Sequence, residues 1–251
     1  LGPLRLKAFE RAVEIGPVLK GMTPVDALRA GIAALDVPDG PDAAAAITAA
    51  VPVMSLTALA MSEGRPAVAP DPELSHAADI LRMLRGVPVS EGEAAALDAY
   101  LTTVSDHGMN ASTFACRVVI ATRASLVSAV TAAYGALSGP LHGGAPGPVL
   151  DMLDAIGTEA AIDGWLDAAL EDGARLMGFG HRIYRTRDPR ADVLKAALQR
   201  LAPDTPRLDF AMKVERAAQA KLAARHKGRA LDTNVEFYTA LLLDALGVPR
   251  A

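Results

Sequence analysis

Three of the five histidines in this 251-residue chain stand beside glycine, at points where the helical spacing of apolar residues breaks. His107 lies in Asp-His-Gly, His142 in Leu-His-Gly-Gly, and His181 in Gly-Phe-Gly-His. Glycine lets the backbone approach a ligand, and imidazole can donate, accept or transfer a proton near neutral pH. One such histidine is usually an ordinary loop residue, but three together indicate a centre that transfers protons or polarises a carbonyl group.

Arginines concentrate directly after His181, at positions Arg182, Arg185, Arg187 and Arg190, although the formal net charge of the chain is -4. A guanidinium group stays charged and binds carboxylate or phosphate groups through two hydrogen bonds. The alternative is a solvated basic surface that is balanced by nearby acids. The adjoining Gly-Phe-Gly-His segment favours an anionic ligand.

A candidate base lies near the carboxyl end of the sequence. Asn234 is a capping residue, so Glu236 falls in the first turn of the helix that follows. Glutamate is common at that place because the helix dipole favours negative charge, and the same field is expected to keep a catalytic carboxylate ionised. His142 precedes a helix that starts after Pro146, whose amide groups are expected to favour a neutral imidazole that donates a hydrogen bond to a carbonyl.

Other catalytic signatures do not occur in the sequence. Residues 135–139 are not a Gly-x-Ser-x-Gly elbow, Gly178-Phe-Gly180 lacks the rest of a dinucleotide fingerprint, and there is no P-loop or His-Glu-x-x-His motif. The three loop histidines could gather a zinc ion, but zinc sites usually show closely paired ligands on one element. We therefore expect no metal and no tightly bound cofactor.

Charge, cysteine content and hydrophobicity indicate which partners and which cellular compartment to expect. An acidic chain gives no general reason to expect nucleic-acid binding. Cys116 is the single cysteine, which fits a reducing, cytoplasmic compartment. No run of about 18 apolar residues is free of charged or turn residues, so we expect no membrane insertion and no export.

The elements that must position these residues are predicted to be helices. Hydrophobic residues make up 51% of the chain and aromatic residues 4%, which favours closely packed aliphatic helices. Asp71 and Pro72 are expected to start one helix, and Ser90 with Glu93 has the spacing of a capping box. The apolar periods predict an all-α fold without a sheet, with helices at 5–20, 24–35, 42–61, 71–86, 90–106, 110–123, 125–137, 148–156, 159–171, from 188 onward, 207–226 and 235–246.

Four strings in this order resemble the citrate synthase family, which includes the 2-methylcitrate synthases. They are Asp106-His107-Gly-Met-Asn110-Ala-Ser112-Thr113, Gly139-Pro-Leu-His142-Gly-Gly144-Ala, Gly178-Phe-Gly-His181-Arg-Ile-Tyr-Arg185-Thr-Arg-Asp188-Pro-Arg190, and Asn234-Val-Glu236-Phe-Tyr238. The resemblance extends from about Leu74 to Gly247. It implies a multihelical homodimer, with a large helical domain at 1–150 and 233–251 and a smaller mobile helical domain at 151–232.

The resemblance also implies a reaction, most simply acetyl-CoA, oxaloacetate and water giving citrate and CoA. His142 would bind the thioester oxygen, Glu236 would remove a proton from the adjacent carbon, and His181 would polarise the ketone. The implied oxo-acid pocket comprises His107, Asn110, Arg190 and Asn234. The implied CoA region comprises Gly178, Phe179, Gly180, Arg185 and Arg229. The CoA thioester is a substrate, and the alternatives are propionyl-CoA as acyl donor or a non-catalytic relative that binds CoA or an oxo acid.

Two features differ from most members of the family. Where their string reads Asn-Val-Asp, this chain has Glu236, and an adjusted pocket is expected to accommodate the extra methylene. Members also continue past the position of Ala251 with further arginines for the oxo-acid carboxylates. The chain is therefore expected to be either part of a longer protein or a reduced relative that cannot form the whole pocket.

Overall fold

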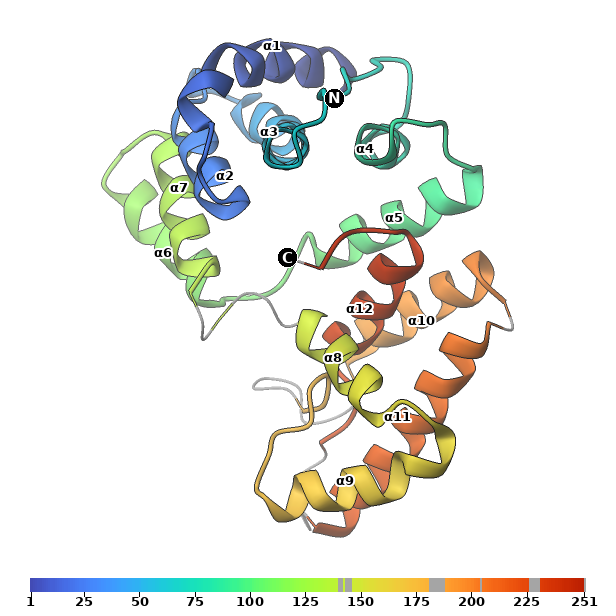
Figure 1. Ribbon diagram of the computed structural model, residues 1–251. Helices are drawn as coiled ribbons and strands as arrows, with labels where there is room; N and C mark the ends of the chain where they lie inside the picture. The colour runs from blue at the N-terminus through green and yellow to red at the C-terminus, as the bar shows by residue number, and fades with distance from the viewer. Residues whose placement is uncertain (140–141, 143–145, 181–187, 204, 226–230, 251) are drawn as a thin grey trace. The chain divides into compact units, whose positions relative to one another are not determined.

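The computed structural model describes the chain except residues 140–141, 143–145, 181–187, 204, 226–230 and 251 (Figure 1). The regular structure of the described residues is helical, which confirms the all-α prediction, and one isolated antiparallel bridge joins Phe179 to Thr233. The helices are α1 (Gly2–Leu19), α2 (Pro24–Ala33), α3 (Ala43–Ser62), α4 (His76–Arg85), α5 (Glu91–Val104), α6 (Ala111–Ala121), α7 (Leu126–Leu137), α8 (Pro146–Ile156), the 3-10 helix η1 (Glu159–Ala161), α9 (Ile162–Glu171), α10 (Pro189–Leu201), α11 (Pro206–Arg225) and α12 (Val235–Ala245).

The chain forms two compact units. Unit 1 contains Leu1–Ala94 and Asp106–Gly143, and unit 2 contains Ala95–Ser105 and Gly144–Ala251. These units do not coincide with the predicted domains at 1–150, 151–232 and 233–251. The division into a large and a smaller mobile domain stays a prediction.

Unit 1 is built around α3. Helices α1 and α2 pack on α3, and α6 pairs with α7, which contacts α2 and α3 (Figure 1). Many buried positions are small, as with Ala50 beside Val53 of α3 and Ala8 of α1. Small side chains let helix axes approach closely, as the low aromatic content predicts.

Helix α3 is, among the described helices, long and apolar enough to cross a membrane by length and composition. It contains Pro52, and 44% of its most apolar 18-residue window is buried in the fold. A core helix of a globular protein passes the same test. The expectation of no membrane insertion stays a prediction.

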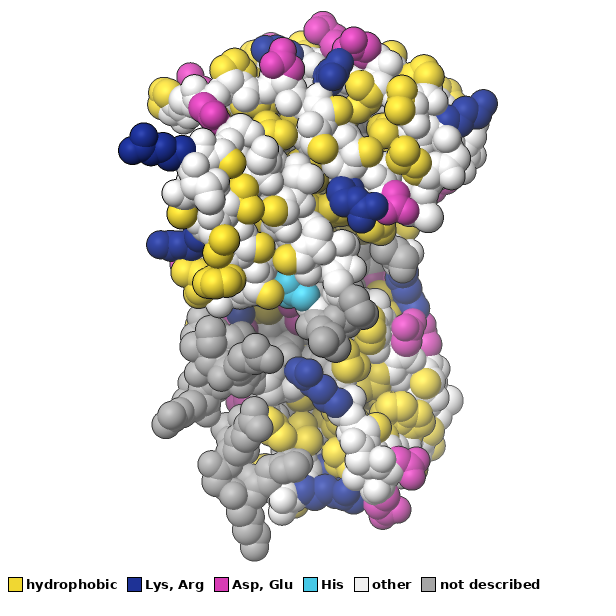
Figure 2. All heavy atoms as spheres, turned by 90° about the vertical axis from the view of Figure 1, so that its left-hand side faces the viewer, with side chains coloured by type: hydrophobic (Ala, Val, Ile, Leu, Met, Phe, Trp, Pro, Cys, Tyr) yellow, Lys and Arg dark blue, Asp and Glu magenta, His cyan; other side chains and the backbone are white. Residues whose placement is uncertain are grey.

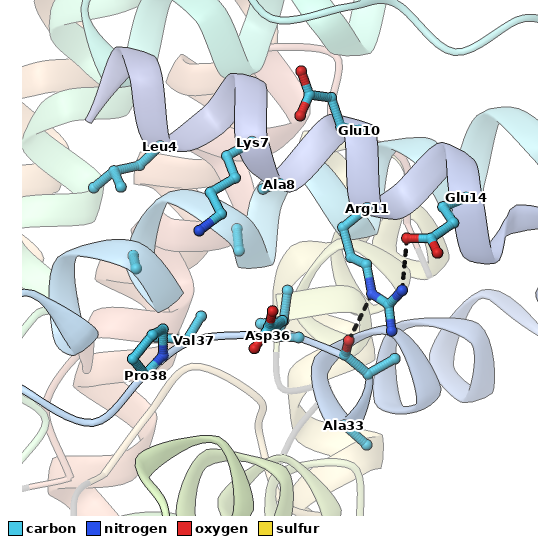
Figure 3. A pocket seen from close by; sticks show the side chains of 14 residues that line it. Leu4, Lys7, Ala8, Glu10, Arg11, Glu14, Ala33, Asp36, Val37 and Pro38 are labelled. Atoms are coloured by element: carbon cyan, nitrogen blue, oxygen red, sulfur yellow. Dashed lines mark hydrogen bonds and ion pairs between the residues drawn. The ribbon is translucent and has the colours of Figure 1, made fainter.

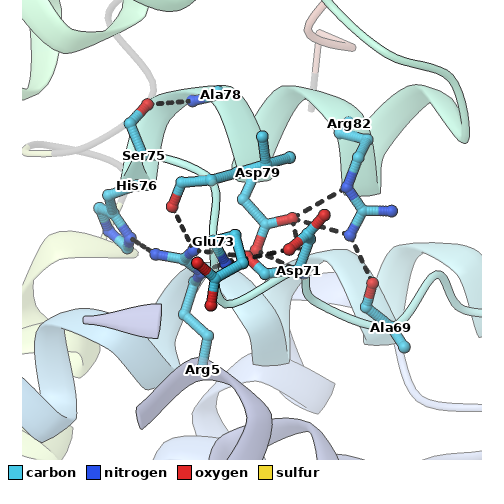
Figure 4. Close-up of polar contacts among 10 residues, drawn as sticks. Arg5, Ala69, Asp71, Glu73, Ser75, His76, Ala78, Asp79 and Arg82 are labelled. Atoms are coloured by element: carbon cyan, nitrogen blue, oxygen red, sulfur yellow. Dashed lines mark hydrogen bonds and ion pairs between the residues drawn. The ribbon is translucent and has the colours of Figure 1, made fainter. Parts of the chain in front are cut away.

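A buried ion pair joins the first and fourth helices (Figure 4). Arg5 of α1 is 1% exposed and its Nε lies 2.7 Å from Oδ2 of Asp79 in α4, which is fully buried. The Arg5 Nη2 atom also donates to the carbonyl oxygens of Asp71, at 3.0 Å, and Leu74, at 2.9 Å. These bonds satisfy a charge that would be costly to bury alone.

The same contacts explain why one predicted helix start is wrong. Helix α4 begins at His76, with Ser75 as its cap, and not at Asp71 and Pro72. The backbone N–H of Asp71 donates to the Asp79 carboxylate, so the ion pair holds residues 71–74 as a non-helical segment. A tertiary contact therefore overrides a favourable local capping signal.

The predicted capping box at the start of α5 is confirmed. Ser90 N–H donates to Oε2 of Glu93 at 2.8 Å, and Glu93 N–H donates to Ser90 Oγ at 3.2 Å. The side chain of Arg85 also donates to Glu93. This hydrogen bond, followed by those from Ser90, lowers the pKa of Glu93 to about 2.

Unit 2 encloses α12. This helix packs against α8 and α10, while α11 contacts α9 and η1. Most residues of α12 are buried, and Phe237 packs edge-on against Tyr238 and tilted against Phe179. A helix buried on nearly all sides is a rigid support for groups at its first turn.

Candidate functional site

His142 is anchored, within unit 1, to the first turn of α6. Its Nε2 atom lies 3.3 Å from the backbone nitrogen of Ser112 and 3.0 Å from Ser112 Oγ. The backbone N–H donates, which assigns Nε2 as its acceptor and the proton of a neutral ring to Nδ1. The single hydroxyl proton of Ser112 then serves either Nε2 or Oδ1 of Asn110. The helix end that contacts His142 is that of α6. The expected effect of the helix after Pro146 on His142 stays a prediction.

Asn110 caps α6, as predicted, and also holds Ser112. Its Oδ1 atom accepts hydrogen bonds from Thr113 N–H at 2.9 Å and from Ser112 Oγ at 2.8 Å. His107 lies exposed on the loop before this cap, where Gly108 has a φ of 66° and donates its N–H to Asp106. The predicted contacts of Asn110 and His107 with an oxo acid stay predictions.

Glu236 occupies the first turn of α12 in unit 2. Its backbone N–H donates to Oδ1 of the capping residue Asn234 at 3.0 Å. Burial raises the pKa of the Glu236 carboxyl group, the positive charge of Arg190 lowers it in part, and Asp188 raises it again. The raised pKa makes Glu236 a stronger base than an exposed glutamate.

Tyr100 of α5 lies within electrostatic reach of Glu236 in unit 2. Burial raises the pKa of the Tyr100 phenol, and the charge of Glu236 raises it further. No motif in the sequence indicated this tyrosine, because the two residues lie far apart along the chain. It becomes a candidate site residue only through the fold.

Arg190 is paired with Asp188, the cap of α10. Its Nε and Nη2 atoms lie 3.0 and 2.8 Å from the two carboxylate oxygens. Asp188 also accepts from the N–H of Val235 at 3.3 Å, which ties the start of α10 to the start of α12. Burial alone would raise the pKa of Asp188, but the hydrogen bonds from Arg190 and Val235 hold it below its ordinary value. Two nitrogens of Arg190 are thus engaged inside the protein, and its role as a carboxylate clamp stays a prediction.

The Gly178–Gly180 segment pairs with the residues before α12. Gly180 N–H donates to the carbonyl of Asp232 at 2.7 Å, and Asn234 N–H donates to the carbonyl of Gly178 at 2.9 Å. The side chain of Asn234 closes the pairing by donating to the Gly180 carbonyl at 2.8 Å. Asn234 therefore links this segment to Glu236, and its predicted substrate contact stays a prediction.

Both glycines of this segment are required by the backbone. Gly178 and Gly180 have φ values of 83° and 79°, and a Cβ atom on Gly178 would lie 2.9 Å from Cβ of Phe237. The Phe179 side chain is 4% exposed and its ring centroid lies 5.4 Å from that of Phe237. Any CoA contact here would thus fall to the backbone and not to the Phe179 ring.

Three predicted residues, His181, Arg185 and Arg229, lie outside the described residues. Within the part of the chain that is described, no three histidine, cysteine or acidic side chains gather as a metal site.

A separate groove of about 670 Å³ lies in unit 1 between α1, α3 and the segment after α2 (Figure 3). Its walls carry charges of both signs, including Lys7 and Asp36, and Arg11 donates to Glu14 and to the carbonyl of Ala34. None of the predicted site residues lines it. The groove is therefore distinct from the candidate site.

Known proteins resemble this chain over nearly its whole length. The family profile "Citrate synthase, C-terminal domain" matches residues 7–251. "Putative citrate synthase 2" of Mycobacterium tuberculosis is 49% identical over 154 residues, 61% of this chain and 41% of that protein. "Citrate synthase" of Deinococcus radiodurans is 33% identical over 241 residues, 92% of this chain and 64% of that protein. The chain thus spans roughly half the length of these relatives.

Solved structures agree with the sequence relatives. The crystal structure of citrate synthase from Pyrobaculum aerophilum superposes with a TM-score of 0.82 at 29% identity, covering 98% of this chain and 68% of that one. The citrate synthase from Thermotoga maritima gives a TM-score of 0.80 at the same identity. The fold, the order of the motifs and the profile match agree, and the chain belongs to the citrate synthase family.

Proposed function

We propose that the whole protein condenses an acyl-CoA thioester with a 2-oxo acid, with acetyl-CoA, oxaloacetate and water giving citrate and CoA. Family membership supports this reaction class. The observation that carries the proposal is the hydrogen bond from Ser112 N–H to Nε2 of His142. It leaves Nδ1–H as a neutral donor, which is the group needed to bind a thioester oxygen as negative charge develops on it.

Removal of the α-proton is the demanding step. The carbon next to a thioester is a far weaker acid than a carboxyl group, so a carboxylate can deprotonate it only if the developing oxyanion is stabilised. A preorganised donor such as the one proposed for His142 contributes about 3 to 4 kcal/mol. The raised pKa of Glu236 adds driving force because it makes this carboxylate a stronger base.

The enolate then attacks the ketone of the oxo acid. In this proposal His181 protonates the ketone oxygen, while Arg190 and His107 bind the carboxylates, supported by Asn110 and Asn234. The backbone of Gly178 to Gly180, with Arg185 and Arg229, binds CoA. Water then hydrolyses the new thioester, and closure of a smaller mobile domain excludes water during the condensation. No metal or tightly bound cofactor takes part in these steps.

We also propose that the protein acts as a homodimer in the cytoplasm, and α6 supports the dimer. No residue of α6 is buried, and Phe114, Val118 and Ile120 are 61%, 51% and 41% exposed. Figure 2 shows apolar side chains on the surface of this part of unit 1. Several exposed apolar side chains on one helix suit a surface that another subunit covers.

A thiol-release assay on the full-length protein tests the reaction. We expect CoA release that requires both oxaloacetate and an acyl-CoA, faster with acetyl-CoA than with propionyl-CoA, and mass spectrometry should identify citrate. Omitting oxaloacetate controls for simple thioester hydrolysis. Faster release with propionyl-CoA would assign the protein as a 2-methylcitrate synthase. If neither acyl donor gives release, the chain is a binding relative and the proposal fails.

A further inference from the structure

A buried carboxylate outside the proposed reaction centre collects three side-chain donors in unit 2. Glu215 of α11 is 2% exposed. Its Oε1 atom accepts from Thr233 Oγ1 at 2.8 Å, and its Oε2 atom accepts from Tyr238 Oη at 2.5 Å and Lys195 Nζ at 3.0 Å. The Lys195 ammonium group also lies 5.3 Å from the centre of the Tyr238 ring.

Two of the three donors to Glu215 flank Glu236 along the chain. Thr233 precedes the cap residue Asn234, and Tyr238 is in the first turns of α12, two residues after Glu236. Gln219, also on α11, donates to Thr233 Oγ1 at 2.9 Å and to Asp232. One face of α11 therefore fixes the backbone on which Glu236 stands, before and after that residue.

The buried carboxylate of Glu215 and the half-buried carboxylate of Glu236 have opposite environments. Burial would raise the pKa of Glu215, but hydrogen bonds from Tyr238, Thr233 and Lys195 hold it below its ordinary value. The pKa of Glu236 is raised. A carboxylate that stays ionised and fully coordinated suits an anchor, whereas one with a raised pKa suits a base.

We infer that Glu215 is a positioning residue for Glu236, because it fixes Thr233 and Tyr238 on either side of the proposed base. The expected effect on catalysis rests on the proposed function. The hydrogen bonds of Glu215 to Thr233 and Tyr238 do not depend on that function. A displacement of about 1 Å at a reacting group can lower the rate on the order of a hundredfold. Loss of the anchor should therefore affect the chemical step and leave the binding of the oxo acid largely unchanged.

The kinetic test uses Glu215→Gln in the full-length protein, at a temperature where the variant is fully folded. Glutamine keeps the size of the side chain but replaces one acceptor oxygen by a donor, so it cannot accept from all three partners. We expect kcat to fall by about 10- to 100-fold, with KM for oxaloacetate changed less than about twofold. Glu171→Gln, which changes an exposed glutamate of the same unit, is the control and should leave both constants unchanged.

A second readout does not depend on catalysis. Amide hydrogen exchange of residues 235–238 should accelerate at least tenfold in Glu215→Gln, while exchange in α9 stays as in the wild type. If Glu215→Gln does not fold, Tyr238→Phe and Thr233→Val, which each remove one donor, are measured in the same two ways. An inactive wild-type protein would contradict the proposed function but not the inference about Glu215. The hydrogen-exchange result would still test whether Glu215 fixes residues 235–238. Wild-type kcat in folded Glu215→Gln, or unchanged exchange at 235–238, would overturn the inference.

Discussion

The backbone N–H of Ser112 lies within hydrogen-bonding distance of Nε2 of His142, 3.3 Å away and 30 positions later in the chain. The contact comes from the second residue of a helix capped by asparagine. Glu236 occupies the same place in a second asparagine-capped helix. Each of the two proposed reactive groups thus depends on the start of a helix. The start of α6 sets the tautomer of His142, and the start of α12 fixes the backbone of Glu236.

The first prediction concerns that tautomer. Nitrogen NMR of the imidazole rings at neutral pH should show His142 with its proton on Nδ1, because Nε2 accepts from Ser112. Ser112→Ala keeps the backbone donor and should keep the tautomer, and loss of the hydroxyl contact should lower kcat about five- to tenfold. A proton on Nε2 in the wild type would contradict the assigned hydrogen bond.

The second prediction concerns Glu236. Glu236→Gln should abolish turnover while leaving oxaloacetate binding intact, because the amide cannot accept the α-proton. Glu236→Asp should lower kcat on the order of a hundredfold, since the carboxylate retreats by about one bond length. Unchanged turnover in Glu236→Gln would remove it from the role of base.

The raised pKa of Glu236 also predicts how pH acts. Its folded pKa lies above the ordinary value of 4.5, so kcat should fall as pH drops through a point above 4.5. For stability the sign is the opposite of that of a paired carboxylate. The folded state holds this proton more tightly than the unfolded chain, so ionisation at higher pH is destabilising. Glu236→Gln should therefore have a Tm at pH 7 equal to or above that of the wild type, and the gain should vanish below pH 4.5.

The third prediction concerns Asp188, whose folded pKa is lowered. Asp188→Asn should lower the free energy of unfolding at pH 7 by about 3 to 5 kcal/mol, because it removes the buried negative charge that accepts two hydrogen bonds from the Arg190 side chain. The contribution of Asp188 is present above its ordinary value of 3.8 and is lost as pH falls through the lower folded pKa. Urea unfolding at pH 7 and pH 3 measures this. Lys213→Met, which removes an exposed ion pair with Glu159, is the control and should cost less than about 1 kcal/mol.

The fourth prediction separates backbone strain from crowding. Gly178 and Gly173 have φ values of 83° and 73°, but a Cβ atom would meet Phe237 at Gly178 and nothing within 4 Å at Gly173. Gly173→Ala should therefore cost only the left-handed conformation, about 1 to 2 kcal/mol. Gly178→Ala should cost about 1 to 3 kcal/mol more, because the core must also shift. If thermal unfolding shows the same loss of stability for both variants, the Phe237 side chain can move aside at no cost, and the prediction is wrong.

Local rules predicted much of this fold from the sequence. Helix caps such as Ser90, Asn110 and Asn234 are recognised by residue type and spacing alone, and each is found at the predicted place. The glycines at 178 and 180 broke the helical pattern, and both have positive φ. These features depend on neighbours within a few residues, which a sequence displays directly.

Contacts between distant segments could not be predicted in the same way. Nothing in the spacing of apolar residues indicates that Ser112 meets His142, or that Glu215 meets Thr233 and Tyr238. The wrongly predicted start of α4 at Asp71 has the same origin. Arg5, 66 positions earlier in the chain, binds the carbonyl of Asp71 and keeps this segment out of the helix. The packing of the helices determines which distant polar groups meet. A single sequence contains little direct information about that packing.

The uncovered face of α6 has a consequence for the handling of the protein. If a second copy covers Phe114, Val118 and Ile120, the free energy of that burial enters the stability only when copies meet. The midpoint of thermal unfolding would then rise with protein concentration, and dilution alone would weaken the fold. Helix α6 also carries the backbone donor for His142. The geometry of the proposed active site would therefore depend on protein concentration as well.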